Sequence, residues 1–357
     1  MDNSYTFIDL CAGIGWWRIW LEQAGFRCLG FSEIDKKAEY TYRTFFGTDE
    51  QNFWDLMNIN PDDLPDFDLL IAGFPCQTFS IVGQRKGMED PRGQVITGIT
   101  NILKAKNTKY FILENVKGLV NHNEGKTMKE ILQMLNEVWY DVQWRVLNSV
   151  DYGLPQSRER VYFLWIRKDL WTSGLRFPNK VLGKAKLQDY LIEKSDIYHC
   201  SKSRLETMDR YLNNKYNKGH TSIDNLLQKE NVIIDTRQSD VRLYNGFSPT
   251  LRTGRHGLLY VKDWYLRELS WLEGLLLQGF PYELANKIVK KLSDKDLLSQ
   301  AGNAMSVNVI QALWEVLYNF ISSLTPNGSY PTLITNCQAM ISKWIWNYRK
   351  VEQPELR

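Results

Sequence analysis

Two segments of the chain carry side chains that could act on a substrate. Cys76 lies in Gly73-Phe74-Pro75-Cys76-Gln77-Thr78-Phe79-Ser80, directly after an apolar run. A cysteine in a loop at the end of a strand is placed as a thiolate nucleophile would be, and the alternative is a buried, inert cysteine. Glu114 follows the apolar run Tyr110–Leu113. A carboxyl group there is costly to desolvate unless it is paired or functional, so it is a second candidate.

Two arginines form a third candidate group. They lie in Gln156-Ser157-Arg158-Glu159-Arg160-Val161, where Arg158 and Arg160 alternate with Glu159. Side chains two residues apart share one face of a strand, so both guanidinium groups are expected on the same side. The alternative is a salt-bridged strand at the surface of the protein.

A glycine-containing turn is a candidate for binding a cofactor. The segment Asp9-Leu10-Cys11-Ala12-Gly13-Ile14-Gly15 runs from an apolar strand pattern into a helical one, and Glu33 closes the next strand pattern. Glycines let the backbone approach a ligand, and an acidic residue at the next strand end can accept hydrogen bonds from ribose hydroxyls. The pattern therefore indicates a nucleoside cofactor, although a purely structural turn has the same sequence.

The elements that must position these groups alternate in type along the first 170 residues. Apolar runs predict strands at 5–10, 27–33, 68–72, 110–113, 142–147 and 161–166, and helical spacing appears at 18–24 and 126–137. This alternation predicts an α/β fold with a doubly wound, mainly parallel sheet, in which ligands bind at the carboxyl ends of the strands. Beyond it, short strands are expected at 232–235 and 258–261, and helices at 268–278 and 306–324.

Composition excludes several classes of protein. Of 357 residues, 43% are hydrophobic and 24% charged, which suits a folded chain of one or two domains. Because no apolar run approaches a membrane span and the N-terminus lacks a basic signal region, we expect a cytoplasmic protein without a membrane partner. Five cysteines without a CxxC pair, and four histidines without an HxxxH pair, argue against a disulfide scaffold and a metal site.

Charge is distributed unevenly along the chain. The segment Ser173–Lys262 has 16 Lys and Arg against 9 Asp and Glu, a net charge of +7, whereas the remainder has 28 against 32, a net charge of −4. Such asymmetry favours a nucleic-acid partner. A lysine-rich solvated surface would give the same count.

Six motifs in this order resemble the bacterial DNA (cytosine-5)-methyltransferases. They are DLCAGIG, GFPCQTFS, ENV, QSRERV, REL running into LQGFP, and GNAMSV, and together they extend from residue 5 to about 325. The resemblance implies a class I S-adenosylmethionine-dependent methyltransferase fold with a smaller target-recognition lobe. On this basis residues 1–185 form the catalytic and cofactor-binding domain, completed by 299–325, and 186–298 form the lobe. The role of the extension 326–357 is not implied.

The resemblance also implies the catalytic residues. Cys76 would add as a thiolate to C6 of a flipped-out cytosine in duplex DNA, and C5 would then accept the methyl group. Glu114 would bond the ring N3 and the exocyclic amine, while Arg160, with Arg158 beside it, would hold O2. Further contacts to the substrate are expected from Gln77, Ser80, Asn115 and Gln156. In this family the loop 77–92 closes over the flipped base.

The cofactor implied is S-adenosylmethionine, with S-adenosylhomocysteine as product and no metal. Glu33 would bind the ribose hydroxyls, and Asp55 with Leu56 the edge of the adenine. The complete expected set is Cys11, Ala12, Gly13, Gly15, Glu33, Ile34, Asp55, Leu56, Pro75, Val95, Asn303 and Ala304. Cys11 stands where the family usually has an aromatic residue, and Ala304 where it usually has serine.

Three other functions fit parts of the sequence. A tRNA cytosine-5-methyltransferase shares the fold, but its typical Cys-Phe-Thr signature is absent and the lobe here is long. A DNA-binding relative without strong catalysis is disfavoured by Cys76, Glu114 and Arg160, and a thiol hydrolase by the lack of a nearby histidine. We therefore expect a monomeric enzyme acting on double-stranded DNA in a restriction-modification or phage-related context, with a cognate restriction endonuclease encoded nearby.

Tryptophan is abundant, with 13 residues. Several stand where this family normally has glycine: Trp16, Trp54 and Trp139, with Trp20 and Trp165 as further candidates. Glycine is used where the backbone needs a positive φ or a close approach, and tryptophan is the largest misfit there. The pattern predicts a UGA codon that the source organism reads as glycine. The alternative is that Trp16 and Trp17 pack beside the adenine.

Overall fold

The fold consists of two compact units of the chain. The computed structural model describes residues 5–74, 95–170, 175–181, 183, 185–217, 221–237, 240–254, 256–288 and 291–324. The described residues of the first unit lie within 5–148, 159–179 and 309–324, and those of the second within 149–158 and 180–308. The sequence-based boundaries differ from this division, because 149–158 and 299–308 make their contacts with the second unit rather than the first.

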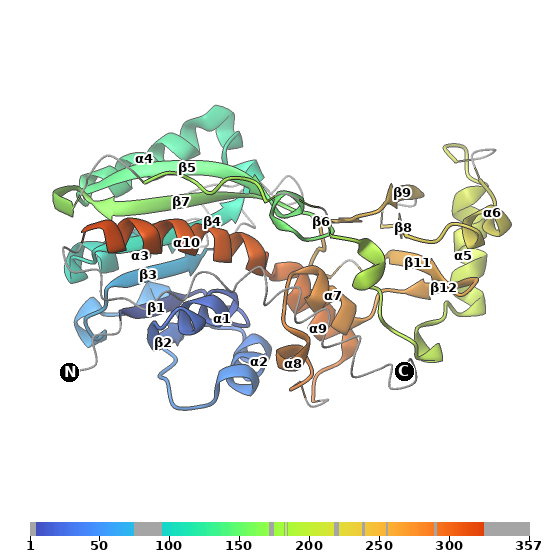
Figure 1. Ribbon diagram of the computed structural model, residues 1–357, viewed down its shortest axis with the longest axis horizontal. Helices are drawn as coiled ribbons and strands as arrows, with labels where there is room; N and C mark the ends of the chain where they lie inside the picture. The colour runs from blue at the N-terminus through green and yellow to red at the C-terminus, as the bar shows by residue number, and fades with distance from the viewer. Residues whose placement is uncertain are drawn as a thin grey trace. The chain divides into compact units, whose positions relative to one another are not determined.

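The first unit is built on a six-stranded sheet (Figure 1). Its order is β2 (Arg27–Ser32), β1 (Thr6–Leu10), β3 (Leu69–Gly73), β4 (Tyr110–Val116), β7 (Glu159–Arg167) and β5 (Tyr140–Asn148). The first four strands are parallel, and β7 runs antiparallel to both of its neighbours. The predicted α/β class with a mainly parallel sheet is therefore confirmed.

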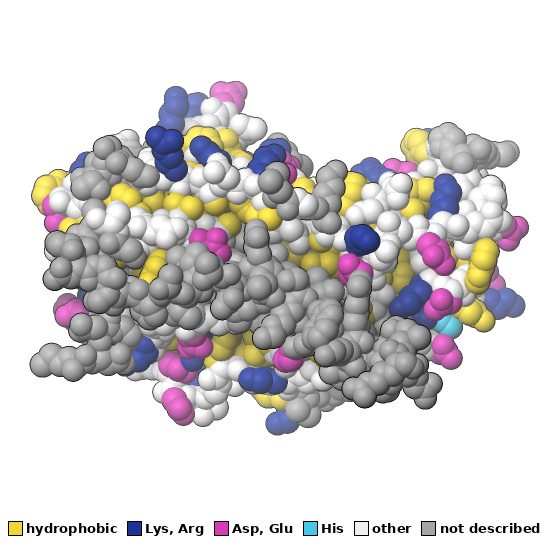
Figure 2. All heavy atoms as spheres, viewed as in Figure 1, with side chains coloured by type: hydrophobic (Ala, Val, Ile, Leu, Met, Phe, Trp, Pro, Cys, Tyr) yellow, Lys and Arg dark blue, Asp and Glu magenta, His cyan; other side chains and the backbone are white. Residues whose placement is uncertain are grey.

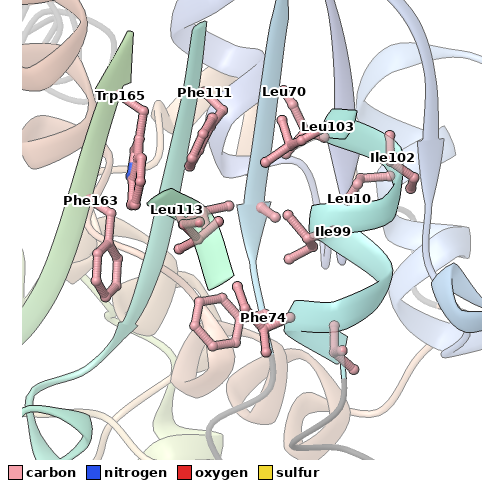
Figure 3. Close-up of a cluster of buried hydrophobic side chains, with 14 of the residues drawn as sticks. Leu10, Leu70, Phe74, Ile99, Ile102, Leu103, Phe111, Leu113, Phe163 and Trp165 are labelled. Atoms are coloured by element: carbon pink, nitrogen blue, oxygen red, sulfur yellow. The ribbon is translucent and has the colours of Figure 1, made fainter. Parts of the chain in front are cut away.

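Helices cover both faces of this sheet. They are α1 (Trp16–Gln23), α2 (Lys36–Phe46), α3 (Val95–Lys106), α4 (Lys126–Glu137) and α10 (Val307–Leu324). In the buried cluster on one face, Leu70 of β3 lies beside Ile99 and Leu103 of α3, and Phe111 of β4 stacks on Trp165 of β7 (Figure 3). Residues one position along, such as Ile71 and Ile112, point to the opposite face and are also fully buried. In the view of Figure 1, α1 and α10 lie in front of the sheet.

Local sequence sets the ends of α2. The carboxylate of Asp35 accepts hydrogen bonds from the N–H groups of Lys37 and Ala38, which caps the N-terminus of the helix. Gly47, with φ +95°, ends it. Neither α2 nor α3 was predicted from the sequence.

The second unit contains a four-stranded antiparallel sheet. Its order is β12 (Tyr265–Glu268), β11 (Leu258–Lys262), β8 (Val232–Asp235) and β9 (Arg242–Asn245), and β10 (Ser248–Pro249) pairs separately with β6 (Gln156–Ser157). Its helices are α5 (Lys202–Leu212), α6 (Ile223–Leu227), α7 (Trp271–Leu277), α8 (Tyr282–Ala285) and α9 (Asp294–Asn303). Met208 and Leu212 of α5 pack on Ile234 and Leu259 of the sheet.

Several predicted elements differ from the structure in their bounds, and two of these differences have a clear local cause. The helix expected at 268–278 begins only at Trp271, because Glu268 still belongs to β12 and Ser270 caps the helix through its side chain. The single strand expected to carry Arg158 and Arg160 is interrupted: β6 ends at Ser157 and β7 begins at Glu159. In the described part of the chain, no helix is long and apolar enough to cross a membrane.

Candidate active site

The glycine turn follows β1 directly. Cys11, Gly13 and Gly15 have φ of +52°, +57° and +88°, and Gly15 is the residue that precedes α1. A side chain at Gly15 would collide with the ring of Phe46, so close packing as well as the positive φ requires glycine there. The chain thus turns sharply from strand to helix at the carboxyl end of β1.

Glu33, one residue after β2, is bonded to this turn. One carboxylate oxygen, Oε2, accepts the N–H of Gly13 at 2.8 Å, and Oε1 accepts the N–H of Asp35 at 2.7 Å. Burial raises the pKa of Glu33, and the two N–H donors partly offset this. The structure therefore brings Glu33 and the glycine turn together, as the sequence predicted.

Asn52 is a residue of this site that sequence reasoning missed. Its side-chain oxygen accepts the N–H groups of Glu33 at 3.1 Å and Trp54 at 2.9 Å, and its amide nitrogen donates to the carbonyl of Glu33 at 3.0 Å. One side chain thus joins the segment after β2 to the segment that leads to Asp55. Only the isolated bridge between Phe31 and Asn52 identifies it, and that pairing is not readable from sequence.

The other predicted cofactor residues of the first unit lie on the segments around this turn. Asp55 caps the short helix η1 (Leu56–Asn58), its Oδ1 accepting the N–H of Met57 at 3.0 Å. Leu56 and Val95 are buried, whereas Ile34 is 68% exposed. Ala12 is buried, and its N–H donates to the carbonyl of Ser32 at 3.0 Å.

A buried ion pair lies at the end of β4. The Nε of Arg160 is 3.0 Å from Oε1 of Glu114, and the two side chains are 14% and 9% exposed. Their position follows from strand register: Val116 pairs with Arg160 and Glu114 with Tyr162, so Glu114 and Arg160 are diagonal neighbours on one face. The structure brings these two predicted catalytic residues together.

Asn115 connects this pair to the chain just before Cys76. Its amide nitrogen donates to the carbonyl of Phe74 at 3.3 Å, and its oxygen accepts the N–H of Val116 at 2.8 Å. The side chain is fully buried, and both of these contacts are with backbone atoms. Residues 75–94 lie outside the described residues, and they include Pro75, Cys76, Gln77, Ser80 and the whole loop 77–92.

The glycine turn and the ion pair both lie at the carboxyl ends of the parallel strands. Leu10 pairs with Ala72, and Ala72 with Leu113, so these residues form one line across three parallel strands. Two strand spacings amount to about 10 Å. The turn after β1 and Glu114 on β4 therefore flank the end of β3, from which the chain leads to Cys76.

The three described cysteines are unsuited to nucleophilic attack. Burial raises the pKa of Cys28 and Cys200 to about 12, and that of Cys11 further still. A thiol is a nucleophile only when deprotonated, so these three remain inert at neutral pH.

Arg158 makes its described contacts away from the Glu114–Arg160 pair. Its guanidinium donates from Nη1 to the carbonyls of Leu251 and Gly302, both at 3.3 Å, within the second unit. The expectation that Arg158 and Arg160 share one strand face is wrong, because alternation holds only inside a continuous strand and Arg158 lies in the break between β6 and β7.

Gln156, Asn303 and Ala304 also belong to the second unit. Gln156 is fully buried and braces the backbone, with Nε2 donating to the carbonyl of Leu277 at 3.0 Å. Asn303 ends α9 and accepts a hydrogen bond from the hydroxyl of Thr253, and Ala304 is buried directly after it.

A cavity of about 230 Å³ lies in the second unit, lined by residues that include Asp235, Arg237, Asp240, Arg242, Tyr244 and Arg252. Arg237 is fixed by Asp235 at 2.6 Å and by the carbonyl of Thr250 at 2.9 Å. Arg242 is 52% exposed and paired with Asp240. On the face shown in Figure 2, Lys and Arg side chains are interspersed with Asp and Glu.

Known proteins resemble the chain over most of its length. The family described as C-5 cytosine-specific DNA methylase matches residues 5–319. Type II methyltransferase M.HhaI of Haemophilus parahaemolyticus is 33% identical, covering 90% of this chain and 96% of the relative. Type II methyltransferase M.HaeII of Haemophilus aegyptius is 35% identical with the same coverage.

A solved structure supports the fold. The Entamoeba histolytica methyltransferase EhMeth superposes with a TM-score of 0.67 at 18% identity, covering 89% of this chain and 99% of that one. The family match and the identity to the Haemophilus enzymes go further, and they show that this chain belongs to the C-5 cytosine-specific DNA methylases.

Proposed function

We propose that this DNA cytosine-5-methyltransferase uses Cys76 as its nucleophile, Glu114 and Arg160 as the groups that bind the target base, and the glycine turn with Glu33 to hold S-adenosylmethionine. The observation that carries the proposal is the register of β1, β3 and β4, which aligns Leu10, Ala72 and Leu113 at one sheet edge. The cofactor turn and the ion pair thereby flank the strand that leads to Cys76.

The residues of the turn suit the cofactor. An ionised carboxylate oxygen can accept more than one hydrogen bond, so both oxygens of Glu33 retain capacity for ribose hydroxyls beside the N–H donors they already accept. Gly13 has no side chain to obstruct the ligand. Asp55 and Leu56 would meet the adenine, with Ile34, Val95, Pro75, Asn303 and Ala304 completing the site. S-adenosylmethionine supplies the methyl group.

The chemistry explains why a thiolate and an acid are needed together. C5 of cytosine is a poor nucleophile until Cys76 adds to C6, which moves electron density onto the ring. Glu114, hydrogen-bonded to N3, and Arg160, near O2, would stabilise that density. After C5 has taken the methyl group, loss of its proton and departure of Cys76 restore the aromatic ring and free the enzyme.

The second unit would supply DNA recognition. Its net positive segment and the arginine-lined cavity suit phosphates and base edges in duplex DNA. The target cytosine must leave the base stack to reach Cys76. We further propose that 186–298 chooses the sequence, and that the enzyme works as a monomer in a restriction-modification context, since the relatives are Type II methyltransferases.

Trapping tests the nucleophile. Bisulfite sequencing of DNA from cells that express the chain identifies the target, and a duplex of that sequence is then made with 5-fluorocytosine. Fluorine cannot leave as a proton does, so a covalent complex should accumulate as a shifted band on a denaturing gel. Cys76→Ala should abolish the band and the control Cys200→Ala should retain it. A band that survives Cys76→Ala would assign the nucleophile elsewhere.

A lobe exchange tests the recognition role. Replacing residues 186–298 by the corresponding segment of a relative with a different target should transfer the target sequence, read by bisulfite sequencing. A chimaera that keeps the original target would contradict the assignment of the lobe, and would leave the trapping result unaffected.

A further inference from the structure

Three tryptophans of the described chain have backbone conformations that glycine normally adopts. Trp54, Trp139 and Trp264 have φ of +60°, +74° and +67°. In this region the Cβ of an L-residue crowds the following carbonyl oxygen, and glycine alone enters it freely. A bulky aromatic residue there is a marked outlier. No other tryptophan in the described ranges has a positive φ.

Trp264 lies in a hairpin whose geometry specifies glycine. Lys262 of β11 pairs with Tyr265 of β12, so Asp263 and Trp264 form a two-residue loop. Both have positive φ, +51° and +67°. This is the pattern of a type I′ turn, for which Asn-Gly and Asp-Gly are strongly preferred. Asp263 fits the first position, and Trp264 stands at the glycine position.

Trp139 lies where a helix is most often ended by glycine. Val138 caps the C-terminus of α4, and Trp139 is the next residue. Its N–H donates to the carbonyl of Asn136 at 3.2 Å while its φ is +74°. A left-handed residue directly after the cap is the common helix ending, and it is usually glycine.

Trp54 is held in its conformation from both sides of its backbone. Its N–H donates to Asn52 at 2.9 Å, and its carbonyl accepts the hydroxyl of Ser32 at 2.5 Å. These bonds join the segments around Glu33 and Asp55, and a change to negative φ would disrupt them.

Packing of the indole rings gives no reason for tryptophan at these positions. The three residues are 45%, 60% and 70% exposed. By contrast, Trp17, Trp165 and Trp314 are 1%, 0% and 5% exposed and have ordinary backbone conformations. Trp16, which the sequence grouped with Trp54 and Trp139, is the first residue of α1 and buried, so backbone conformation does not support glycine there.

We infer that glycine is the natural residue at positions 54, 139 and 264, each encoded by a UGA codon that the source organism reads as glycine. UGA differs from the tryptophan codon UGG by one base, and some genetic codes read it as tryptophan. A single reassigned codon explains three unrelated misfits together. The inference holds whatever DNA sequence the enzyme methylates.

The coding DNA and the protein made by the source organism test the inference directly. UGA is expected at 54, 139 and 264, and UGG at Trp17 and Trp314. Peptides of the native protein that span the three positions should each carry glycine in mass spectrometry. UGG codons there, or UGA codons with tryptophan in the peptides, would overturn the inference.

Stability of the chain tests the conformational argument separately. Trp→Gly at the three positions together should raise Tm, by about 2 °C or more for each position. Trp→Ala at the same positions removes the rings but keeps the Cβ, so it should gain clearly less. As a matched control, Trp144 is 39% exposed on β5, and Trp144→Gly should lower Tm because glycine weakens a strand. Equal gains from alanine and glycine would contradict the role of φ.

Discussion

Each unit of the molecule contains an arginine paired with a carboxylate, and the two pairs are built differently. In the second unit Arg237 donates two hydrogen bonds to the carboxylate of Asp235, from Nε at 2.7 Å and from Nη2 at 2.6 Å. Its Nη1 donates to the backbone carbonyl of Thr250. In the first unit Arg160 meets Glu114 through Nε at 3.0 Å and donates Nη1 to the carbonyl of Glu159. The bidentate geometry in the second unit suits a structural role, whereas the pair in the first unit lies at the carboxyl ends of parallel strands, where such sheets bind ligands.

The largest effect is expected when the Glu114–Arg160 pair of the first unit is broken. Glu114→Gln keeps the shape of the side chain but removes the charge that pairs with Arg160. Turnover on the target duplex should fall by about 10²–10³-fold, in addition to any loss of Tm from leaving Arg160 without its charge partner. Glu137→Gln, on the exposed end of α4, is the control and should retain full turnover. A large loss of Tm with normal turnover would make the pair a structural brace as well.

Breaking the Asp235–Arg237 pair of the second unit should instead lower the free energy of unfolding. Asp235→Asn leaves the guanidinium of Arg237 buried without its charge partner, and unfolding in urea should report a loss of about 3 kcal/mol. Trapping by 5-fluorocytosine at saturating DNA should persist in the folded fraction.

The stability lost in Asp235→Asn should depend on pH. Burial opposes ionisation of Asp235, but hydrogen bonds from Arg237 prevail and lower its pKa. A carboxylate with a lowered pKa stabilises the fold above the unfolded value of about 3.9 and loses that contribution as pH falls further. The difference in free energy of unfolding between the unaltered chain and Asp235→Asn should therefore be largest at pH 7 and shrink below about pH 4. A difference independent of pH would exclude the ion pair as its source.

A smaller effect is expected at the cofactor turn. Glu33→Gln replaces an acceptor-only carboxylate by an amide, and affinity for S-adenosylmethionine, measured by calorimetry, should fall about 10- to 100-fold. Burial raises the pKa of Glu33, so this side chain becomes protonated at a pH above the unperturbed value of about 4.3. As the pH is lowered, the affinity of the unaltered chain for S-adenosylmethionine should therefore begin to fall above that value. The affinity of the variant should stay flat in that range, and a matching fall would implicate another group.

The smallest effect is expected for Arg242, which can be compared with Arg237 in the same unit. Arg242 is half exposed, in contrast to the buried Arg237. Arg242→Gln should reduce the salt dependence of DNA binding by about one counterion, measured by fluorescence anisotropy across salt concentrations, with little change in Tm. Lys229→Gln, at a residue that does not line the cavity, is the control. An unchanged slope for Arg242→Gln would remove it from the DNA contacts.

Prediction from sequence succeeded where structure depends on neighbouring residues. The bounds of α4 and β8 match the expected 126–137 and 232–235, because a helical stripe and a short apolar run are local patterns. Glu33 was expected at the end of a strand and lies directly after β2, whereas Glu114, expected just after a strand, lies inside β4, which continues to Val116. Asn52 and the true partners of Arg158 were not predicted, since they depend on contacts between distant segments. Trp264 was overlooked because the length of its hairpin loop becomes visible only once β11 and β12 are paired.

The position of α10 has a consequence for biosynthesis. Every strand of the first sheet has been synthesised by residue 167, whereas α10 begins only at Val307, after residues 180–306 of the second unit. Ile310, Leu313 and Leu317 of this helix are buried, and Trp314 packs on Phe26 with ring centroids 4.4 Å apart. A nascent chain therefore leaves the part of the apolar sheet face that α10 covers exposed through about 140 residues of translation. Chaperones that bind nascent chains should engage that face, and chains that end before residue 307 should aggregate.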